Sequence, residues 1–200
     1  IDYARGRAGL DAYRLAVALA PIFMFLTDNV RSFRGSGARL CPRMARSLVW
    51  EDVDPARCGV IPGTYADGFG AQRYLEWLEG VRPILFTDAL GTTTSTGKRS
   101  IREVMGDRIL SATEALSLFD AVHPYVRLAR RMEFLQADSL RPRMAVGYAC
   151  LVKGIFCNAL AFDGASDLVG QRSEDEVNLA AYELRTRGWD ACVYDRPVSE

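Results

Sequence analysis

Arg127, Arg131 and Glu133 are separated by even numbers of residues within segment 125–137. Successive side chains of a β-strand point to opposite faces, so these three side chains would share one face of a strand. A glutamate there could offer a hard oxygen ligand to Mg²⁺, while the arginines neutralise charge on phosphoryl oxygens. The pattern indicates polyphosphate chemistry. The alternative, which composition and spacing alone favour, is a solvated strand edge of ion pairs worth about 0–1 kcal/mol each.

Other reactive residue types carry weaker signals. The single histidine, His123, precedes Pro124, a context typical of a structural turn. Five cysteines, with no CxxC pair and no histidine cluster, are evidence against a disulfide framework and against a zinc site. We expect reduced thiols in a cytoplasmic protein. Cys150 and Cys157 fall on one helical face, where we expect them to be buried as small hydrophobic residues.

Composition bounds the class of protein. The 200 residues are 49% hydrophobic and 25% charged, enough for one domain with a core, residues 1–200. The formal net charge is zero, so no overall field would attract nucleic acid or an anionic membrane. The most apolar stretch, residues 15–26, is short for a bilayer and contains Pro21, so we expect a buried helix and no membrane span. No secretory leader pattern follows Ile1.

The elements that must position these residues are predicted from periodicity and capping signals. We expect a helix over 8–27 that Pro21 kinks or shortens, a short helix over 74–79 and a helix over 142–160. Capping boxes at Ser111 and Ser173 predict helices over 111–122 and 173–188. Segments 81–86 and 125–137 are predicted strands. Residues 28–70 are predicted to be irregular, and residues 91–97 a surface loop.

Several ordered blocks resemble one enzyme family. The blocks are RLAVALAPIFMFLTDN, RSLVWEDVDPARCG, DGFGAQRYLEWLEGVRPILF, VRLARRMEFLQADSL, YACLVKGIF and GWDACVYDRPV. Together they resemble the C-terminal half of glutamate-cysteine ligases of the plant and proteobacterial type. In the second block, Arg46 and Trp50 occupy the positions of the family's Arg-x-x-x-Trp pattern.

The resemblance implies an α+β fold, in which a curved antiparallel sheet flanked by helices forms part of a glutamine synthetase-like catalytic domain. It also implies an ATP- and Mg²⁺-dependent reaction, the first step of glutathione biosynthesis. ATP phosphorylates the side-chain carboxylate of glutamate, and the amine of cysteine then displaces phosphate to give gamma-glutamylcysteine. The implied partners are these small molecules and the missing N-terminal half of the enzyme, with neither nucleic acid nor membrane.

The resemblance assigns roles to five residues. Glu133 resembles the strand glutamate that holds Mg²⁺, and Arg127 resembles an arginine of the same strand that faces the phosphates or glutamate. Arg131, the second expected catalytic arginine, better resembles the corresponding strand of the related glutamine synthetases, since the closer family often has an aromatic residue there. Arg46 and Asn29 occupy positions expected to bind substrate. For the arginines, a surface ion pair remains the alternative.

One departure from the family pattern bears directly on activity. Leu135 stands where the family has the second arginine of Glu-x-Arg, and leucine offers no charge to a transferring phosphoryl group. A catalytically impaired relative or a non-catalytic binding subunit of the same fold is therefore the alternative function.

Overall fold

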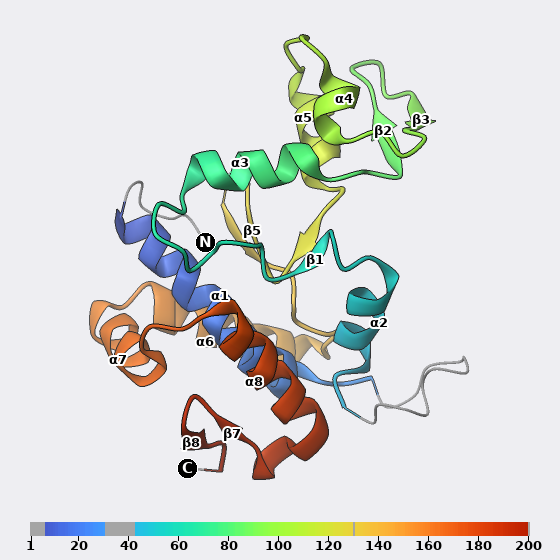
Figure 1. Cartoon of the computed structure of the whole chain (residues 1–200). Helices are drawn as coiled ribbons and strands as arrows, with labels where there is room; N and C mark the ends of the chain where they lie inside the picture. The colour runs from blue at the N-terminus through green and yellow to red at the C-terminus, as the bar shows by residue number, and fades with distance from the viewer. Residues whose placement is uncertain (1–6, 31–42, 130, 200) are drawn as a thin grey trace.

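The computed structural model describes residues 7–30, 43–129 and 131–199. It combines helices with short strands, consistent with the α+β class (Figure 1). The helices are α1 (Arg7–Thr27), α2 (Ala45–Val53), α3 (Ala71–Gly80), α4 (Ile101–Met105), α5 (Ala112–Phe119), α6 (Pro142–Phe156), α7 (Ala159–Val169) and α8 (Glu174–Arg187). The strands are β1 (Cys58–Gly59), β2 (Leu85–Thr87), β3 (Thr93–Ser95), β4 (His123–Pro124), β5 (Val126–Leu128), β6 (Met132–Phe134), β7 (Cys192–Val193) and β8 (Arg196–Pro197).

Helix α1 forms the centre of the larger hydrophobic core. Its residues are apolar around most of the helix circumference, as expected for a buried helix, and Ala16 and Ala20 are fully buried. Helix α8 packs against it (Figure 1). The helix continues through Pro21 to Thr27, so the expectation that proline shortens it is wrong. The lost backbone hydrogen bond is tolerated because tertiary packing stabilises the helix.

Helix α1 also has the length and apolar composition of a membrane span. The bent pair α6 and α7 passes the same test when its two helices are taken together. However, 61% of the apolar window of α1 is buried inside the chain, as in core helices of water-soluble proteins. The structure thus has the buried helix that the sequence predicts, and its bounds differ by one residue from those predicted.

The two predicted capping boxes are confirmed. The Ser111 side chain accepts a hydrogen bond from Glu114 N at the start of α5, and Ser173 accepts one from Glu176 N at the start of α8. Gly188, at φ 63°, ends α8 in the left-handed conformation that glycine adopts most easily. The buried side chains of α8 follow helical spacing and face the core; they are Val177, Ala180, Ala181 and Leu184.

Segment 125–137 is a hairpin and not the single strand predicted. Strands β5 and β6 are antiparallel, with Arg127 opposite Glu133, and Arg131 lies exposed in the turn between them. Alternation of apolar and charged residues cannot distinguish one long strand from two short ones, because both have a period of two. The described strands form four separate two-stranded sheets, so the curved sheet implied by the resemblance is not confirmed.

Helices α3, α4 and α5 and the β2–β3 hairpin enclose a smaller apolar cluster. Its buried members are Leu78, Val81, Phe86, Ile101, Leu118 and Val122. The predicted strand over 81–86 is only partly correct, because β2 begins at Leu85 and Ile84 is exposed. The predicted loop over 91–97 contains β3, which pairs with β2.

Three helices were not predicted separately, and of these only α2 begins without a side-chain capping bond, since Ser100 caps α4 and Asn158 caps α7. Helix α2 lies within the segment predicted to be irregular, and its N-cap residue, Met44, makes no side-chain capping bond. Helix α4 begins with a capping box formed by Ser100 and Glu103. The predicted helix over 142–160 ends at Phe156, and α7 follows after a bend of 88°.

Helices α6 and α7 leave much of their apolar surface in solvent. The exposed side chains include Met144, Val146, Leu151, Leu160 and Leu168. Cys150 and Cys157 are exposed on α6 and at its end, so the expectation that they are buried is wrong. The described cysteines, which exclude Cys41, are all free, in agreement with the expected reduced thiols.

Replacing Ser173 by alanine tests the capping box of α8. Ser173→Ala should lower the free energy of unfolding by about 1 kcal/mol, because the amide of Glu176 loses its acceptor at the helix start. Urea denaturation measures this loss, with Ser95→Ala on the exposed strand β3 as the control. An equal effect of the two substitutions would contradict the assignment.

Candidate functional site

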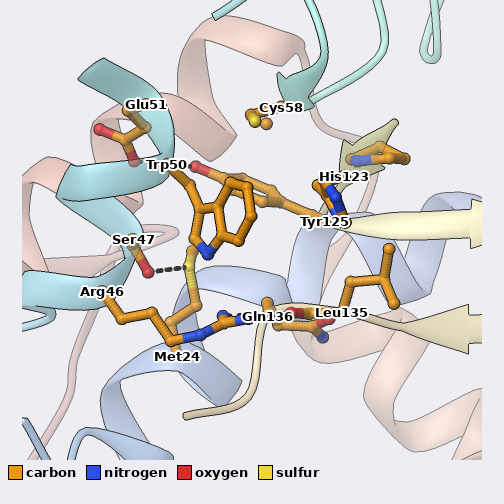
Figure 2. Close-up of a pocket in the computed structure, with 12 residues that line it drawn as sticks. Met24, Arg46, Ser47, Trp50, Glu51, Cys58, His123, Tyr125, Leu135 and Gln136 are labelled. Carbon is orange, nitrogen blue, oxygen red and sulfur yellow. Dashed lines mark hydrogen bonds between the residues drawn. The ribbon is translucent and has the colours of Figure 1, made fainter. Parts of the chain in front are cut away.

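A cavity of about 270 Å³ lies between α2, the β1–β4 pair and the chain that follows β6 (Figure 2). The described residues lining it are Met24, Arg46, Ser47, Trp50, Glu51, Cys58, Gly59, His123, Pro124, Tyr125, Leu135 and Gln136. Arg46 is the one arginine or lysine among them. The cavity therefore combines a single cation with aromatic and apolar walls, a composition typical of small-molecule sites.

Helix α2 supplies Arg46 and Trp50, which are four residues apart and so share one helix face. The Arg46 guanidinium lies 5.9 Å from the centre of the Trp50 ring, in cation–π contact. Arg46 Nη1 also donates to the Leu135 carbonyl oxygen at 3.2 Å. In Figure 2 the arginine extends toward Leu135 and Gln136, and these contacts fix its direction.

The β1–β4 pair supplies His123. His123 N donates to Arg57 O at 2.7 Å, and Tyr125 N donates to Gly59 O at 2.8 Å, so the two segments run parallel. This pairing places the His123 ring 4.5 Å from the Trp50 ring, centre to centre. Burial, followed by the charges of Arg127, Arg57 and Arg46, lowers the pKa of His123. The imidazole is therefore neutral near pH 7.

Glu51 joins three elements at one wall of the cavity. Arg185 Nη2 of α8 donates to both of its carboxylate oxygens, at 2.9 and 2.8 Å, and the Tyr125 hydroxyl donates to Oε1 at 3.3 Å. The carboxylate is thus engaged within the fold. Burial, with a smaller contribution from Asp54, raises the pKa of the Cys58 thiol, so this sulfur is not an activated nucleophile.

Gln136 is the most unusual lining residue. Its side chain is 5% exposed, and neither Oε1 nor Nε2 has a hydrogen-bond partner in the described part of the chain. Buried amides are normally paired, because an unpaired one costs about 1–3 kcal/mol. Gln136 could not be predicted as a site residue, because no spacing or motif marks a lone glutamine after a strand.

The five residues assigned by resemblance do not gather in one place. Of the five, Arg46 lines the cavity, together with Leu135, the residue that departs from the resemblance. Asn29 is not a lining residue: its backbone N donates to Asp138 Oδ2 at 3.0 Å and its Nδ2 donates to Ser139 O at 2.8 Å. These bonds attach the end of α1 to the chain beyond β6. The functional roles of all five remain predictions.

Arg127 and Glu133 pair with each other across the hairpin. Arg127 Nε lies 2.7 Å from Glu133 Oε2, and its Nη1 lies 3.0 Å from Asp120 Oδ1. Nη1 also donates to Phe119 O at 3.0 Å. This geometry is that of the ion-paired strand edge considered from the sequence.

Glu133 is not part of a cluster of metal ligands within the described residues. Glu133 is engaged by Arg127, and residues 7–30, 43–129 and 131–199 contain no group of three histidine, cysteine, aspartate or glutamate residues that could hold a metal ion. Within this part of the protein, the chemistry available at the cavity is recognition of an anion and not activation of a nucleophile.

Comparison with known proteins gives a distant match to one kind of enzyme. The chain is 23% identical over 195 residues to glutamate-cysteine ligase B, chloroplastic, of Oryza sativa subsp. japonica. It is 22% identical over the same length to the chloroplastic glutamate-cysteine ligase of Nicotiana tabacum, and 25% identical over 145 residues to that of Brassica juncea. No family model matches the sequence.

The coverage of these matches is unequal. The rice and tobacco matches each cover 94% of this chain, but only 39% and 37% of the respective relatives, and the Brassica match covers 69% of this chain and 28% of the relative. The chain thus spans about two-fifths of the length of the rice and tobacco relatives. The matches support a distant relationship to glutamate-cysteine ligases and so to a ligase-like enzyme family.

The lowered pKa of His123 predicts a pH dependence of stability. Near its ordinary pKa of 6.5, the unfolded chain binds a proton that the folded chain does not. The free energy of unfolding should therefore fall as the pH drops through 6.5, and the loss should be smaller in His123→Gln. Urea denaturation at about pH 8 and about pH 5.5, above the ordinary range of carboxyl groups, measures this difference. Equal losses in the two proteins would contradict it.

Proposed function

We propose that this chain is part of a glutamate-cysteine ligase-like enzyme and that it contributes an amino-acid-binding cavity. The observation that carries the proposal is the position of Arg46: the arginine that the family resemblance assigns to substrate is the cation of a small, largely apolar cavity. A guanidinium forms strong, directional hydrogen bonds with a carboxylate, and glutamate and cysteine both carry one. The distant similarity over 94% of the chain supports the same assignment.

In the proposed longer protein, ATP transfers its γ-phosphoryl group to the side-chain carboxylate of glutamate. The amine of cysteine then attacks the acyl phosphate, an amide bond forms, and phosphate leaves. The cavity would hold an amino acid in place while this chemistry occurs, which lowers the entropic part of the barrier. Further ligands of Mg²⁺ and ATP would be supplied from outside the described residues, because Glu133 is engaged by Arg127 and the described residues contain no cluster of metal ligands.

A non-catalytic binding subunit is the second candidate. Leu135 favours it, because this residue replaces a family arginine and supplies only its backbone carbonyl to Arg46. Such a subunit would retain the amino-acid cavity without taking part in phosphoryl transfer.

Removing the Arg46 guanidinium should weaken glutamate binding. Arg46→Ala should raise the dissociation constant by about 10- to 100-fold, because a hydrogen bond to a charged group contributes about 1.5–3 kcal/mol. Arg46→Lys keeps the positive charge but loses the paired N–H groups of the guanidinium, so its dissociation constant should lie between those of Arg46→Ala and the wild type. Titration calorimetry on the 200-residue chain gives the affinities. Arg73→Ala is the control, because Arg73 is exposed and pairs with Glu76 on α3. An unchanged affinity in Arg46→Ala would refute the site.

The chain alone should not complete the reaction. With Mg²⁺, ATP, glutamate and cysteine, it should release phosphate no faster than a blank, because Glu133 is engaged by Arg127 and the described residues hold no metal cluster. A coupled phosphate assay makes the measurement. Sustained release that depends on both amino acids would show that the phosphoryl-transfer site lies within these residues.

A further inference from the structure

The backbone around Gln136 is fixed on both sides. Leu135 N donates to Tyr125 O at 3.1 Å, and Asp138 N donates to Thr27 Oγ1 at 3.2 Å. The segment therefore cannot easily turn the glutamine outward to reach water. Its amide is confined to the cavity wall, beside the carbonyl group that accepts from Arg46.

An unpaired amide at this position is costly in the absence of a ligand. It offers two N–H donors and a carbonyl acceptor, and burying them without partners costs about 1–3 kcal/mol. A leucine or methionine would fill a similar volume without this cost. A ligand that accepts from Nε2 or donates to Oε1 would offset the cost on binding, as expected of a recognition residue.

We propose that Gln136 Oε1 accepts a hydrogen bond from the α-ammonium group of an amino acid whose α-carboxylate binds Arg46. The proposal rests on the function proposed above and specifies the ligand. Arg46 and Gln136 lie on neighbouring parts of the wall, and the two ends of a zwitterionic α-amino acid group carry the charges that complement a guanidinium and an amide oxygen (Figure 2). The neutral imidazole of His123 adds no charge that would repel the ammonium.

This arrangement discriminates between the two amino acids of the reaction. A site that binds both the α-carboxylate and the α-ammonium group leaves the side chain of the amino acid free to react. The α-amine itself is held by the site and cannot act as a nucleophile. Glutamate reacts through its side-chain carboxylate, whereas cysteine reacts through its α-amine. The cavity is therefore the glutamate site, with Gln136 as the residue that distinguishes an amino acid from a simple carboxylate.

Paired titrations with glutamate and glutarate test the proposal, because glutarate has both carboxylates and lacks the amine. The 200-residue chain should bind glutamate about 10- to 100-fold more tightly than glutarate, the range expected for one charge-assisted hydrogen bond. Gln136→Met should remove this preference by weakening glutamate binding alone. Gln72→Met, on the exposed face of α3, should keep it.

Thermal unfolding without ligand gives a second readout. Gln136→Met should leave the melting temperature unchanged or raise it, because the substitution removes a buried unpaired amide. A large drop would show that the amide is satisfied within the fold and would overturn the proposal.

The outcomes separate this inference from the function on which it rests. If the wild type binds glutamate and glutarate equally, and Gln136→Met changes neither affinity, the role of Gln136 is refuted while the Arg46 carboxylate site stands. If the wild type binds neither ligand, both the proposed function and the role of Gln136 are overturned.

Discussion

The cavity depends on the carboxylate of Glu51. Arg185 binds it from α8 and Tyr125 from the chain after β4, so one side chain ties α2 to two other parts of the fold. Helix α8 is itself packed on α1 in the larger core, and this places α2 in a fixed position relative to that core. Arg46 and Trp50 lie within the same short helix as Glu51. Because the pair is only partly exposed, loss of either charge would leave its partner poorly solvated, and the wall of the site would lose its support.

The sequence predicted several elements whose signals are local, although the capping box at Ser100 was missed. The capping boxes at Ser111 and Ser173 and the terminating Gly188 depend on neighbours a few residues away, so pattern and structure agree there. Features set by distant contacts were missed. Helix α2 has no side-chain cap, and the segment around Arg127 folds back on itself although its alternation fits a single strand equally well. Arg127 and Glu133 still share one face, as predicted, but as cross-strand neighbours and not as residues of one strand.

The same distinction holds at the candidate site. The family resemblance singled out Arg46 and Trp50, and the structure places both on the cavity, on a helix that the sequence did not predict. Gln136 could not be identified in advance, because its importance comes from the absence of a partner, which only three-dimensional packing defines. Its neighbour Leu135 departs from the family pattern, and both residues line the cavity. This wall of the cavity therefore combines an apolar side chain with an unpaired amide.

The apolar surfaces left open on α6 and α7 have a consequence for how the chain behaves in solution. Contacts between two such surfaces would be favoured by the release of water, and charge repulsion ordinarily opposes them. This chain has a formal net charge of zero and an isoelectric point near 6.8, so that opposition is weakest close to neutrality. The chain should therefore associate most readily near neutral pH, where the His123 imidazole is already uncharged. Raising the pH by a few units gives the chain a net negative charge, which restores repulsion between molecules and leaves His123 neutral.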